Sequence, residues 1–237
     1  MIEIDEGFYF GMGAFETLAV KNGVALMCKE HLARLHHSLK FFNISNVISE
    51  VQIREFIARH QFINGVLKIA VSEKNIDISV RENPYTGEIY RKGFHLWVSS
   101  FPRNEASLLT SHKTLNYAEN IIAKRIALSH QAQEALFLNT KGEISEGSSS
   151  NIFFIKGKQL FTPSKDSGIL PGIMREIICA GENVQERKIT LSDLSEFEEC
   201  FITNSVIGVM KVCSIGNHTF TSSELTEKLR NNYSRYF

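Results

Sequence analysis

The sequence predicts an α+β protein with two domains, a small N-terminal domain over residues 1–105 and a larger C-terminal domain over residues 106–237. Three observations predict this class. The 237 residues are 43% apolar, which is enough for one large core or two small ones. The first half alternates hairpin-like runs with helical runs, which is typical of an α+β fold with a largely antiparallel sheet. A polar, proline-bounded segment, PRNEASLLTSH, follows and is predicted to be the linker.

The first half is predicted to open with a hairpin in FETLAVKNGVALM, where Asn22-Gly23 favours the positive φ of a tight turn. A helix follows in KEHLARLHHSLKFFNI, because three leucines recur on one helical face. A second helix is predicted from Ser49 to His60. Three strands complete this half, in GVLKIAVS, IDISVR and FHLWVSS.

The second half is predicted to begin with an amphipathic helix, NYAENIIAKRIALSHQ. Strands are expected in EALFLN, NIFFIK, QLFTP, VQERKI, CFITN and GVMKVCSI, with helical segments in IMREIICAGE and TLSDLSEF. The last helix is expected to begin in TSSE, where Thr221 and Glu224 have the spacing of a capping box.

Charge and composition exclude several classes of function. Lys plus Arg equals Asp plus Glu, 26 each, which argues against binding to nucleic acid or to an anionic membrane. No apolar stretch reaches the roughly 20 residues of a membrane helix. The N-terminus lacks a signal pattern and the four cysteines are scattered, so we expect a cytoplasmic protein with reduced thiols. The histidines and cysteines show no metal-ligand spacing, so we predict no metal site.

Two stretches are candidates for chemistry. Lys113, in TSHKTLNYAEN, stands between a polar loop and a helical run, although a solvated surface lysine is the commoner case. In EISEGSSSNIFFI, Glu146 is followed by Gly147 and three serines. Small residues of this kind let a flat ligand approach the backbone, and a flexible polar loop is the alternative.

Two further stretches suit an anion. In SGILPGIMRE a helix is predicted to begin directly after Pro171-Gly172, and a helix start offers unpaired N–H groups, to which Arg175 adds positive charge. Thr203, Asn204 and Ser205 place three short polar groups at the end of a predicted strand. The alternative for the first stretch is an ordinary turn before a helix, and the alternative for the second is a strand cap. Together the four stretches match the needs of pyridoxal phosphate: a lysine to form an imine, a carboxylate for the pyridine nitrogen and a cradle for the phosphate.

The order of the sequence blocks resembles a known family. GMGAFETLAV, HLARLHHSL, HKTLNY, GEISEGSSSNIFF, FTPSKDSGILPGIMRE and TNSVIGVMKV follow one another as in the class IV, or fold-type IV, pyridoxal-phosphate enzymes. That group contains branched-chain aminotransferases, D-amino acid aminotransferases and aminodeoxychorismate lyases. The resemblance implies a small N-terminal α/β sandwich, a larger domain with a barrel-like sheet, and a homodimer in which one subunit places residues near the other subunit's cofactor.

The resemblance also implies roles for individual residues. Lys113 matches the lysine that forms the imine, Glu146 the carboxylate on the pyridine nitrogen, and Arg34 the arginine that grips the phosphate. The remaining cofactor-binding matches are the backbone amides of Ile173 and Met174, the hydroxyl of Ser205 with Asn204 beside it, and Tyr117 near the phenolic oxygen. Tyr117 lies one residue closer to the lysine than its counterpart in branched-chain aminotransferases.

Three features favour a lyase that converts 4-amino-4-deoxychorismate into 4-aminobenzoate and pyruvate, a step of folate precursor synthesis. The chain is short and begins near its first motif, it has FET rather than FEG, and TNS precedes Gly208 where branched-chain enzymes have GTAAE. A class IV aminotransferase for branched-chain or D-amino acids is the alternative, because Glu73-Lys74 replaces the family's RG and the same catalytic residues serve both reactions. A non-catalytic cofactor-binding protein is a third hypothesis, which the intact lysine, glutamate and arginine disfavour.

Overall fold

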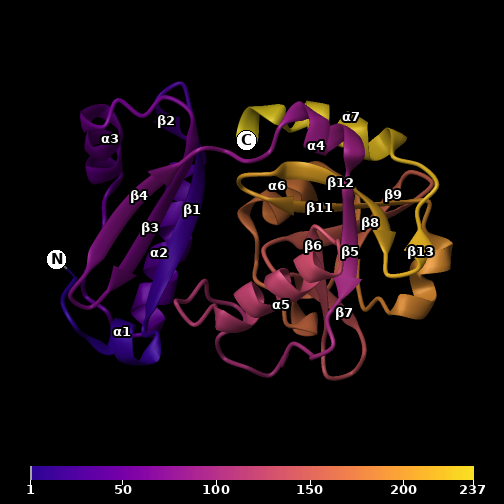
Figure 1. Ribbon diagram of the computed structural model, residues 1–237, viewed down its shortest axis with the longest axis horizontal. Helices are drawn as coiled ribbons and strands as arrows, with labels where there is room; N and C mark the ends of the chain where they lie inside the picture. Colours follow the sequence, from indigo (N-terminus) through magenta and orange to yellow (C-terminus); the bar gives the residue numbers. More distant parts are fainter. Residues whose placement is uncertain (1) are drawn as a thin grey trace. The chain divides into compact units, whose positions relative to one another are not determined.

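The computed structural model describes residues 2–237, which divide into two compact units (Figure 1). The first unit contains the chain up to Pro84, residues 112–117 and the last two residues. The second contains residues 85–111 and 118–235. Among residues 2–237 we find no helix with the length and apolar character that crossing a membrane requires.

The first unit is built on a four-stranded antiparallel sheet with the strand order β2-β1-β3-β4. Its strands are β1 (Gly13–Lys21), β2 (Val24–Ala25), β3 (Gly65–Ser72) and β4 (Ile76–Arg81). The predicted hairpin is confirmed: Asn22 and Gly23 have φ of 52° and 75° and join β1 to β2. Positive φ at both positions gives the turn a twist that matches its strands.

Two helices, α2 (Cys28–Phe41) and α3 (Glu50–Arg59), cover one face of this sheet, and both were predicted. Leu32, Leu35 and Leu39 of α2 are buried against it, as their spacing requires. α3 begins with a capping box between Ser49 and Gln52. A short helix near the N-terminus, α1 (Glu6–Phe10), was not predicted.

The second unit contains a nine-stranded mixed sheet. Its strand order is β10-β9-β8-β11-β12-β5-β6-β7, with β13 paired to β12. β7 also contacts β8 and β9, so the sheet curls on itself, which confirms the expected barrel-like form. The strands are β5 (Phe94–Val98), β6 (Glu134–Leu138), β7 (Ile144–Gly147), β8 (Asn151–Lys156), β9 (Gln159–Pro163), β10 (Val184–Arg187), β11 (Glu199–Asn204), β12 (Gly208–Ile215) and β13 (His218–Thr219).

β5 belongs to this second sheet, which corrects the predicted domain assignment of its residues. It pairs in parallel with β12 and with β6, whereas we had placed it in the domain that ends at residue 105. The sequence could not reveal this, because an apolar run shows that a strand forms but not which strand it will pair with.

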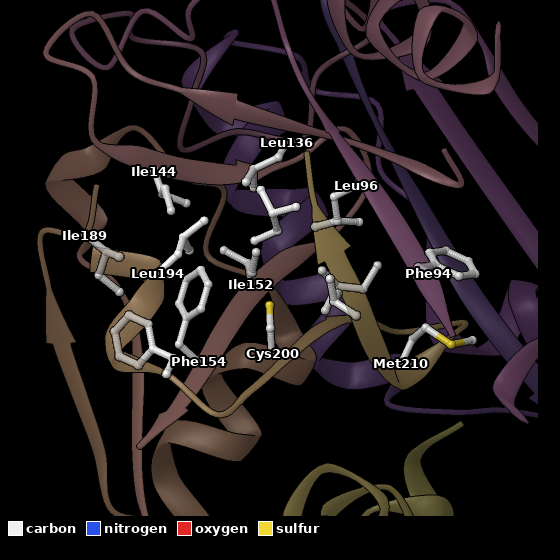
Figure 2. Close-up of a cluster of buried hydrophobic side chains, with 14 of the residues drawn as sticks. Phe94, Leu96, Leu136, Ile144, Ile152, Phe154, Ile189, Leu194, Cys200 and Met210 are labelled. Atoms are coloured by element: carbon white, nitrogen blue, oxygen red, sulfur yellow. The ribbon is translucent and has the colours of Figure 1, made fainter. Parts of the chain in front are cut away.

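The curl of the sheet encloses a large apolar core (Figure 2). Leu96 of β5, Leu136 of β6, Ile152 and Phe154 of β8 and Met210 of β12 point toward one another in it. Each is at most 2% exposed, and burying a side chain of this size contributes roughly 1.5–3 kcal/mol. This packing gives the polar side chains on the surrounding strands a rigid support.

Four α-helices accompany the second sheet: α4 (Gly87–Lys92), α5 (Ala118–Ser129), α6 (Ile173–Gly181) and α7 (Glu224–Asn232). Short 3₁₀ turns occur at Lys165–Ser167, Leu191–Glu196 and Ser234–Tyr236. α5 departs from the amphipathic pattern that we expected. It packs through Ala123 and Ala127, and leaves Ile121 and Ile122 44% and 48% exposed.

The start of α7 also differs from the prediction. Its N-cap is Ser223, which makes no side-chain cap, so the capping box of Thr221 and Glu224 was wrong. The carboxylate of Glu199, on β11, caps this helix instead. It accepts hydrogen bonds from the backbone amides of Leu225 at 3.0 Å and Thr226 at 2.8 Å. A buried carboxylate on a strand thereby pairs with the first backbone N–H groups of the helix, which have no partner in the local sequence.

Candidate functional site

Lys113 is positioned by backbone pairing with β1. The amide of Phe15 donates to the carbonyl of Lys113 at 2.9 Å, and the amide of Leu115 donates to the carbonyl of Gly13 at 2.9 Å. Ala14 and Thr114 form an isolated antiparallel bridge between them. The lysine therefore stands on an extended segment that is fixed to a sheet, and not on a free loop.

The side chain of Lys113 lies over aromatic rings. Its Nζ is 4.4 Å from the ring centre of Phe15 and 5.1 Å from that of Tyr117, and these two rings meet edge to face at 4.9 Å. Lys68 of β3 places its own Nζ 5.1 Å from the Phe15 ring. Two ammonium groups thus lie over one aromatic ring, and each is attracted electrostatically to the negative π face of that ring.

Arg34 lies in the first unit too, held by a carboxylate. Its Nε donates to Glu16 Oε1 at 2.7 Å, and a terminal nitrogen donates to Glu16 Oε2 at 2.8 Å. His31 Nδ1 lies 2.6 Å from the same Oε2. Glu16 is wholly buried and His31 is 1% exposed. Residues 31 and 34 are neighbours on the surface of α2, so one carboxylate can reach both.

Burial and pairing act in opposite directions on the carboxyl of Glu16. Burial raises its pKa, while the charge of Arg34 and the hydrogen bonds from Arg34 and His31 lower it, to about 2. Glu16 therefore stays ionised near neutral pH. Burial lowers the pKa of His31, against the pull of Glu16, so the imidazole is neutral there. Its Nε2 has no hydrogen-bond partner among residues 2–237.

In the second unit Glu146 lies on β7 and is 7% exposed. Three groups donate to its carboxylate: Arg103 at 3.2 Å, the side-chain amide of Asn151 at 3.3 Å and the backbone amide of Leu170 at 2.9 Å. Arg103 also stacks over Phe137, with its guanidinium carbon 4.3 Å from the ring centre. Donors of this kind favour the charged form of a carboxylate and fix its direction.

Asn151 connects Glu146 to the start of α6. Its side-chain nitrogen donates to Glu146 and also to the carbonyl of Leu170, at 2.9 Å. Its side-chain oxygen lies so near Gly172 that a Cβ there would come within 1.9 Å. Gly172 must therefore be glycine for the two segments to meet. Asn151 is also the register partner of Thr203 on β11.

The helix start that we predicted is α6, which begins at Ile173 and continues through Met174. Its N-cap is Gly172, which has no side chain that could accept the first amides. Arg175 does not add free positive charge, contrary to our expectation. It is fully buried and pairs with Glu176 at 3.0 Å and Glu186 at 2.7 Å.

Asn204 and Ser205 form a turn after β11. The side-chain oxygen of Asn204 accepts the amides of Val206 at 2.9 Å and Ile207 at 2.8 Å, and its nitrogen donates to the carbonyl of Ser149 at 3.0 Å. Asn204 therefore shapes the turn, and Ser205 follows it, 7% exposed. The buried hydroxyl of Thr203, just before them, has no partner among residues 2–237.

The serine run after Glu146 serves a second buried carboxylate. Ser148, Ser149 and Ser150 all donate to Glu134, which is 1% exposed, and Lys124 lies 3.3 Å from it. We had interpreted these serines only as small residues beside a flat ligand. Their hydroxyls hold the loop against β6, which makes it a rigid edge.

The residues predicted for the site therefore fall into two groups. Lys113, Arg34 and Tyr117 lie in the first unit, and Glu146, Ile173, Met174, Asn204 and Ser205 lie in the second. Sequence reasoning missed the partners that orient them: Glu16, His31, Arg103 and Asn151. Glu16 could have been found, because the alternation of β1 puts it on the face of Ala14, Leu18 and Val20, where a carboxylate requires a donor.

Comparison with known proteins identifies the family. The model for amino-transferase class IV matches residues 13–215, so the chain belongs to this family. The chain is 27% identical to the aminodeoxychorismate lyase of Bacillus subtilis (strain 168), over 98% of this chain and 87% of that one. It is 28% identical to the D-alanine aminotransferase of Bacillus licheniformis, over 92% and 84%.

A solved structure agrees with the fold. The protein named "Putative 4-amino-4-deoxychorismate lyase" from Legionella pneumophila subsp. pneumophila str. Philadelphia 1 superposes with a TM-score of 0.90 at 25% identity, over 100% of this chain and 96% of that one. The predicted two-domain fold-type IV architecture is thereby confirmed.

The protein is a pyridoxal-phosphate-dependent enzyme, since this family uses that cofactor. The residues present fit the group. A carboxylate held by hydrogen-bond donors suits a protonated pyridine nitrogen, and the uncapped amides of α6 suit a phosphate. The partnerless hydroxyl of Thr203 lies in the same region, because its strand position pairs with Asn151.

We predict that His31 makes folding stability depend on pH below 6.5. Its folded pKa is lowered, so on acidification the unfolded chain binds a proton there that the folded chain does not, and the free energy of unfolding falls as pH drops. His31→Gln removes this contribution. Between pH 6.5 and 5 the variant should show a shallower dependence, by up to about 1.4 kcal/mol per pH unit, in urea unfolding.

The window is separate from that of Glu16, whose lowered pKa contributes stability that is lost only as pH falls from 4.5 toward 2. His60→Gln, at an exposed histidine of the same unit, is the matched control. Equal slopes for the wild type and His31→Gln would mean that folding leaves the pKa of His31 unchanged, and a steeper slope in the variant would mean that the ion pair with Glu16 raises that pKa.

Proposed function

We propose that the protein is a cytoplasmic aminodeoxychorismate lyase that converts 4-amino-4-deoxychorismate into 4-aminobenzoate and pyruvate, supplying a folate precursor. The observation that carries the proposal is the likeness to the Legionella protein over nearly the full length of both chains. The FET and TNS blocks, with Thr17 and Ser205, support it. A class IV aminotransferase for branched-chain or D-amino acids is the second candidate, supported by a similar identity to the D-alanine enzyme.

The second unit supplies the groups that hold the cofactor's ring and phosphate. When bound, the cofactor accepts the electron pair that a broken C–H bond leaves behind. Glu146 would bind the pyridine nitrogen and keep it protonated, and Arg103 and Asn151 fix the direction of that carboxylate. The amides of Ile173 and Met174 and the hydroxyl of Ser205 would bind the phosphate, while Asn204 holds the turn that carries Ser205.

The first unit supplies the reactive amine. The Nζ of Lys113 would hold the cofactor covalently. With substrate bound, the same Nζ would take a proton from the substrate ring carbon that bears the nitrogen. The C–O bond to the enolpyruvyl group breaks, enolpyruvate leaves and becomes pyruvate, and the ring becomes aromatic. The ring of Tyr117 lies 5.1 Å from the Nζ of Lys113 and would contact the phenolic oxygen, and Arg34 would bind the phosphate.

The neighbourhood of Lys113 favours an anionic substrate over an aliphatic one. Lys68 lies on the same Phe15 ring as Lys113, so a substrate that approaches the reactive lysine meets a second cation. Aminodeoxychorismate carries two carboxylates, whereas the side chain of a branched-chain amino acid carries none. Because Lys68 is exposed, an ion pair between it and a substrate carboxylate would contribute about 0.2–1 kcal/mol.

The proposal is tested by a product assay on the cofactor-loaded enzyme. With 4-amino-4-deoxychorismate we expect 4-aminobenzoate and pyruvate in equal amounts. In parallel, L-valine, L-leucine and D-alanine are each offered with 2-oxoglutarate, and we expect at least a hundredfold lower kcat/KM. Transamination faster than elimination would identify an aminotransferase and overturn the lyase assignment.

A second test concerns Lys113 alone. Borohydride reduction should fix the cofactor on a single peptide that contains TSHKTLNYAEN. Lys113→Ala should abolish this link and lower kcat by several orders of magnitude, because the covalent anchor and the base are lost together. Lys141→Ala, at an exposed lysine paired with Glu105, is the control and should keep the link. Reduced cofactor on Lys124 or Lys141 would show that the lysine has been misassigned.

We further propose that the enzyme is a homodimer. α1 supports this, because Phe8, Tyr9 and Phe10 are 69%, 65% and 66% exposed, and monomeric surfaces rarely expose three successive aromatic residues. Analytical ultracentrifugation at micromolar concentration should give twice the mass of the 26.8 kDa chain. A fully active monomer would contradict this.

A further inference from the structure

The carboxylate of Glu16 presents a conflict if Arg34 binds a phosphate. A negative charge beside an anion-binding arginine offsets part of the attraction between the guanidinium and the anion. Yet Glu16 is wholly buried, ionised and bonded to Arg34 at two points, 2.7 and 2.8 Å long. The negative charge of Glu16 weakens phosphate binding by Arg34, so we looked for a second effect of this carboxylate that strengthens it.

Glu16 fixes the orientation of the Arg34 guanidinium. A guanidinium bound at Nε and at one terminal nitrogen cannot rotate about its last bonds, because the two parallel hydrogen bonds define its plane. The Arg34 side chain is 14% exposed, whereas that of Glu16 is 0% exposed, so the carboxylate grips the arginine from the core side. β1 fixes Glu16, since its neighbours Phe15 and Thr17 pair with Ala70 and Lys68 of β3.

His31 completes this arrangement. Its Nδ1 lies 2.6 Å from the Glu16 oxygen that also accepts from Arg34, and it comes from the same helix as the arginine. A neutral imidazole that donates from Nδ1 adds a hydrogen bond without adding positive charge. Glu16 is thus held from two positions on α2.

We propose that Glu16 is a positioning residue that fixes the guanidinium plane of Arg34 for the cofactor's phosphate, and that this gain outweighs the charge it offsets. The proposal rests on the proposed role of Arg34. It makes a prediction about sign: neutralising Glu16 should weaken the binding of the phosphate, although electrostatics alone would strengthen it.

The experiment compares two probes on the apoenzyme, pyridoxal 5'-phosphate and pyridoxal, which lacks the phosphate. Equilibrium binding is followed by absorbance and by protein fluorescence. Glu16→Gln keeps the size of the side chain, but its amide has only one accepting oxygen, so it cannot accept the two parallel hydrogen bonds from Nε and the terminal nitrogen of Arg34. We expect about ten- to a hundredfold weaker binding of the phosphate form, by analogy with the loss found when the hydrogen-bond partners of metal-binding residues are removed. Pyridoxal affinity should change less than twofold.

Glu16→Asp is the second variant, and it also serves if Glu16→Gln does not fold. It keeps the charge but draws the carboxylate back by one methylene, so it should weaken the phosphate form as well. Glu55→Gln, at an exposed position of α3, is the matched control and should alter neither probe. In an Arg34→Ala background, Glu16→Gln should cause no further loss, because the residue acts through the arginine.

The outcomes separate the inference from the function on which it rests. Unchanged or tighter binding of the phosphate form by Glu16→Gln, with Arg34→Ala still weakened, would overturn the positioning role alone. Equal losses for both probes would show that Glu16 only maintains the structure, which also overturns it. No loss in Arg34→Ala would instead remove the phosphate role of Arg34, whatever Glu16 does.

Discussion

An ionised carboxylate inside a protein must be surrounded by donors, because leaving water costs it several kcal/mol. Among residues 2–237 the four buried glutamates meet that requirement, and each organises the segment around it. Glu16 holds Arg34 on α2, Glu146 gathers Arg103, Asn151 and the turn before α6, and Glu134 binds the serine loop. Glu199 closes the start of α7. The polar architecture of the enzyme follows from these four centres.

The two side chains that we propose for the chemistry, Lys113 and Glu146, lie on rigid supports. Lys113 is paired to β1, and Glu146 lies on β7 beside a core of fully buried side chains. A side chain fixed at both its backbone and its tip loses little freedom when a ligand binds, so less of the binding free energy is spent on ordering it. The same support would serve a lyase or an aminotransferase, which is why the shared residues alone do not distinguish the two reactions.

Much of the fold could be predicted from the sequence, since the signals for α2, α3 and the hairpin at Asn22 are local. The candidate site was predicted from motif order, which points to Lys113 and Glu146 but not to the residues that orient them. Arg103 could not be predicted in this way. It lies in a polar segment that we interpreted as a linker, and its partner Glu146 is 43 residues away in the sequence. The cap of α7 was wrong for the same reason, because Glu199 reaches it only after β11 and the helix have packed.

The order in which the chain visits its two units has a consequence for its synthesis. The first unit receives the segment that carries Lys113 only after residues 85–111 of the second have been made. A nascent chain that ends at Pro84 can pair β1 with β3. The other edge of β1, at Ala14, stays unpaired until the segment that contains Thr114 has been made. Open strand edges attract other chains, so co-translational folding here depends on keeping that edge protected until residue 117 has left the ribosome.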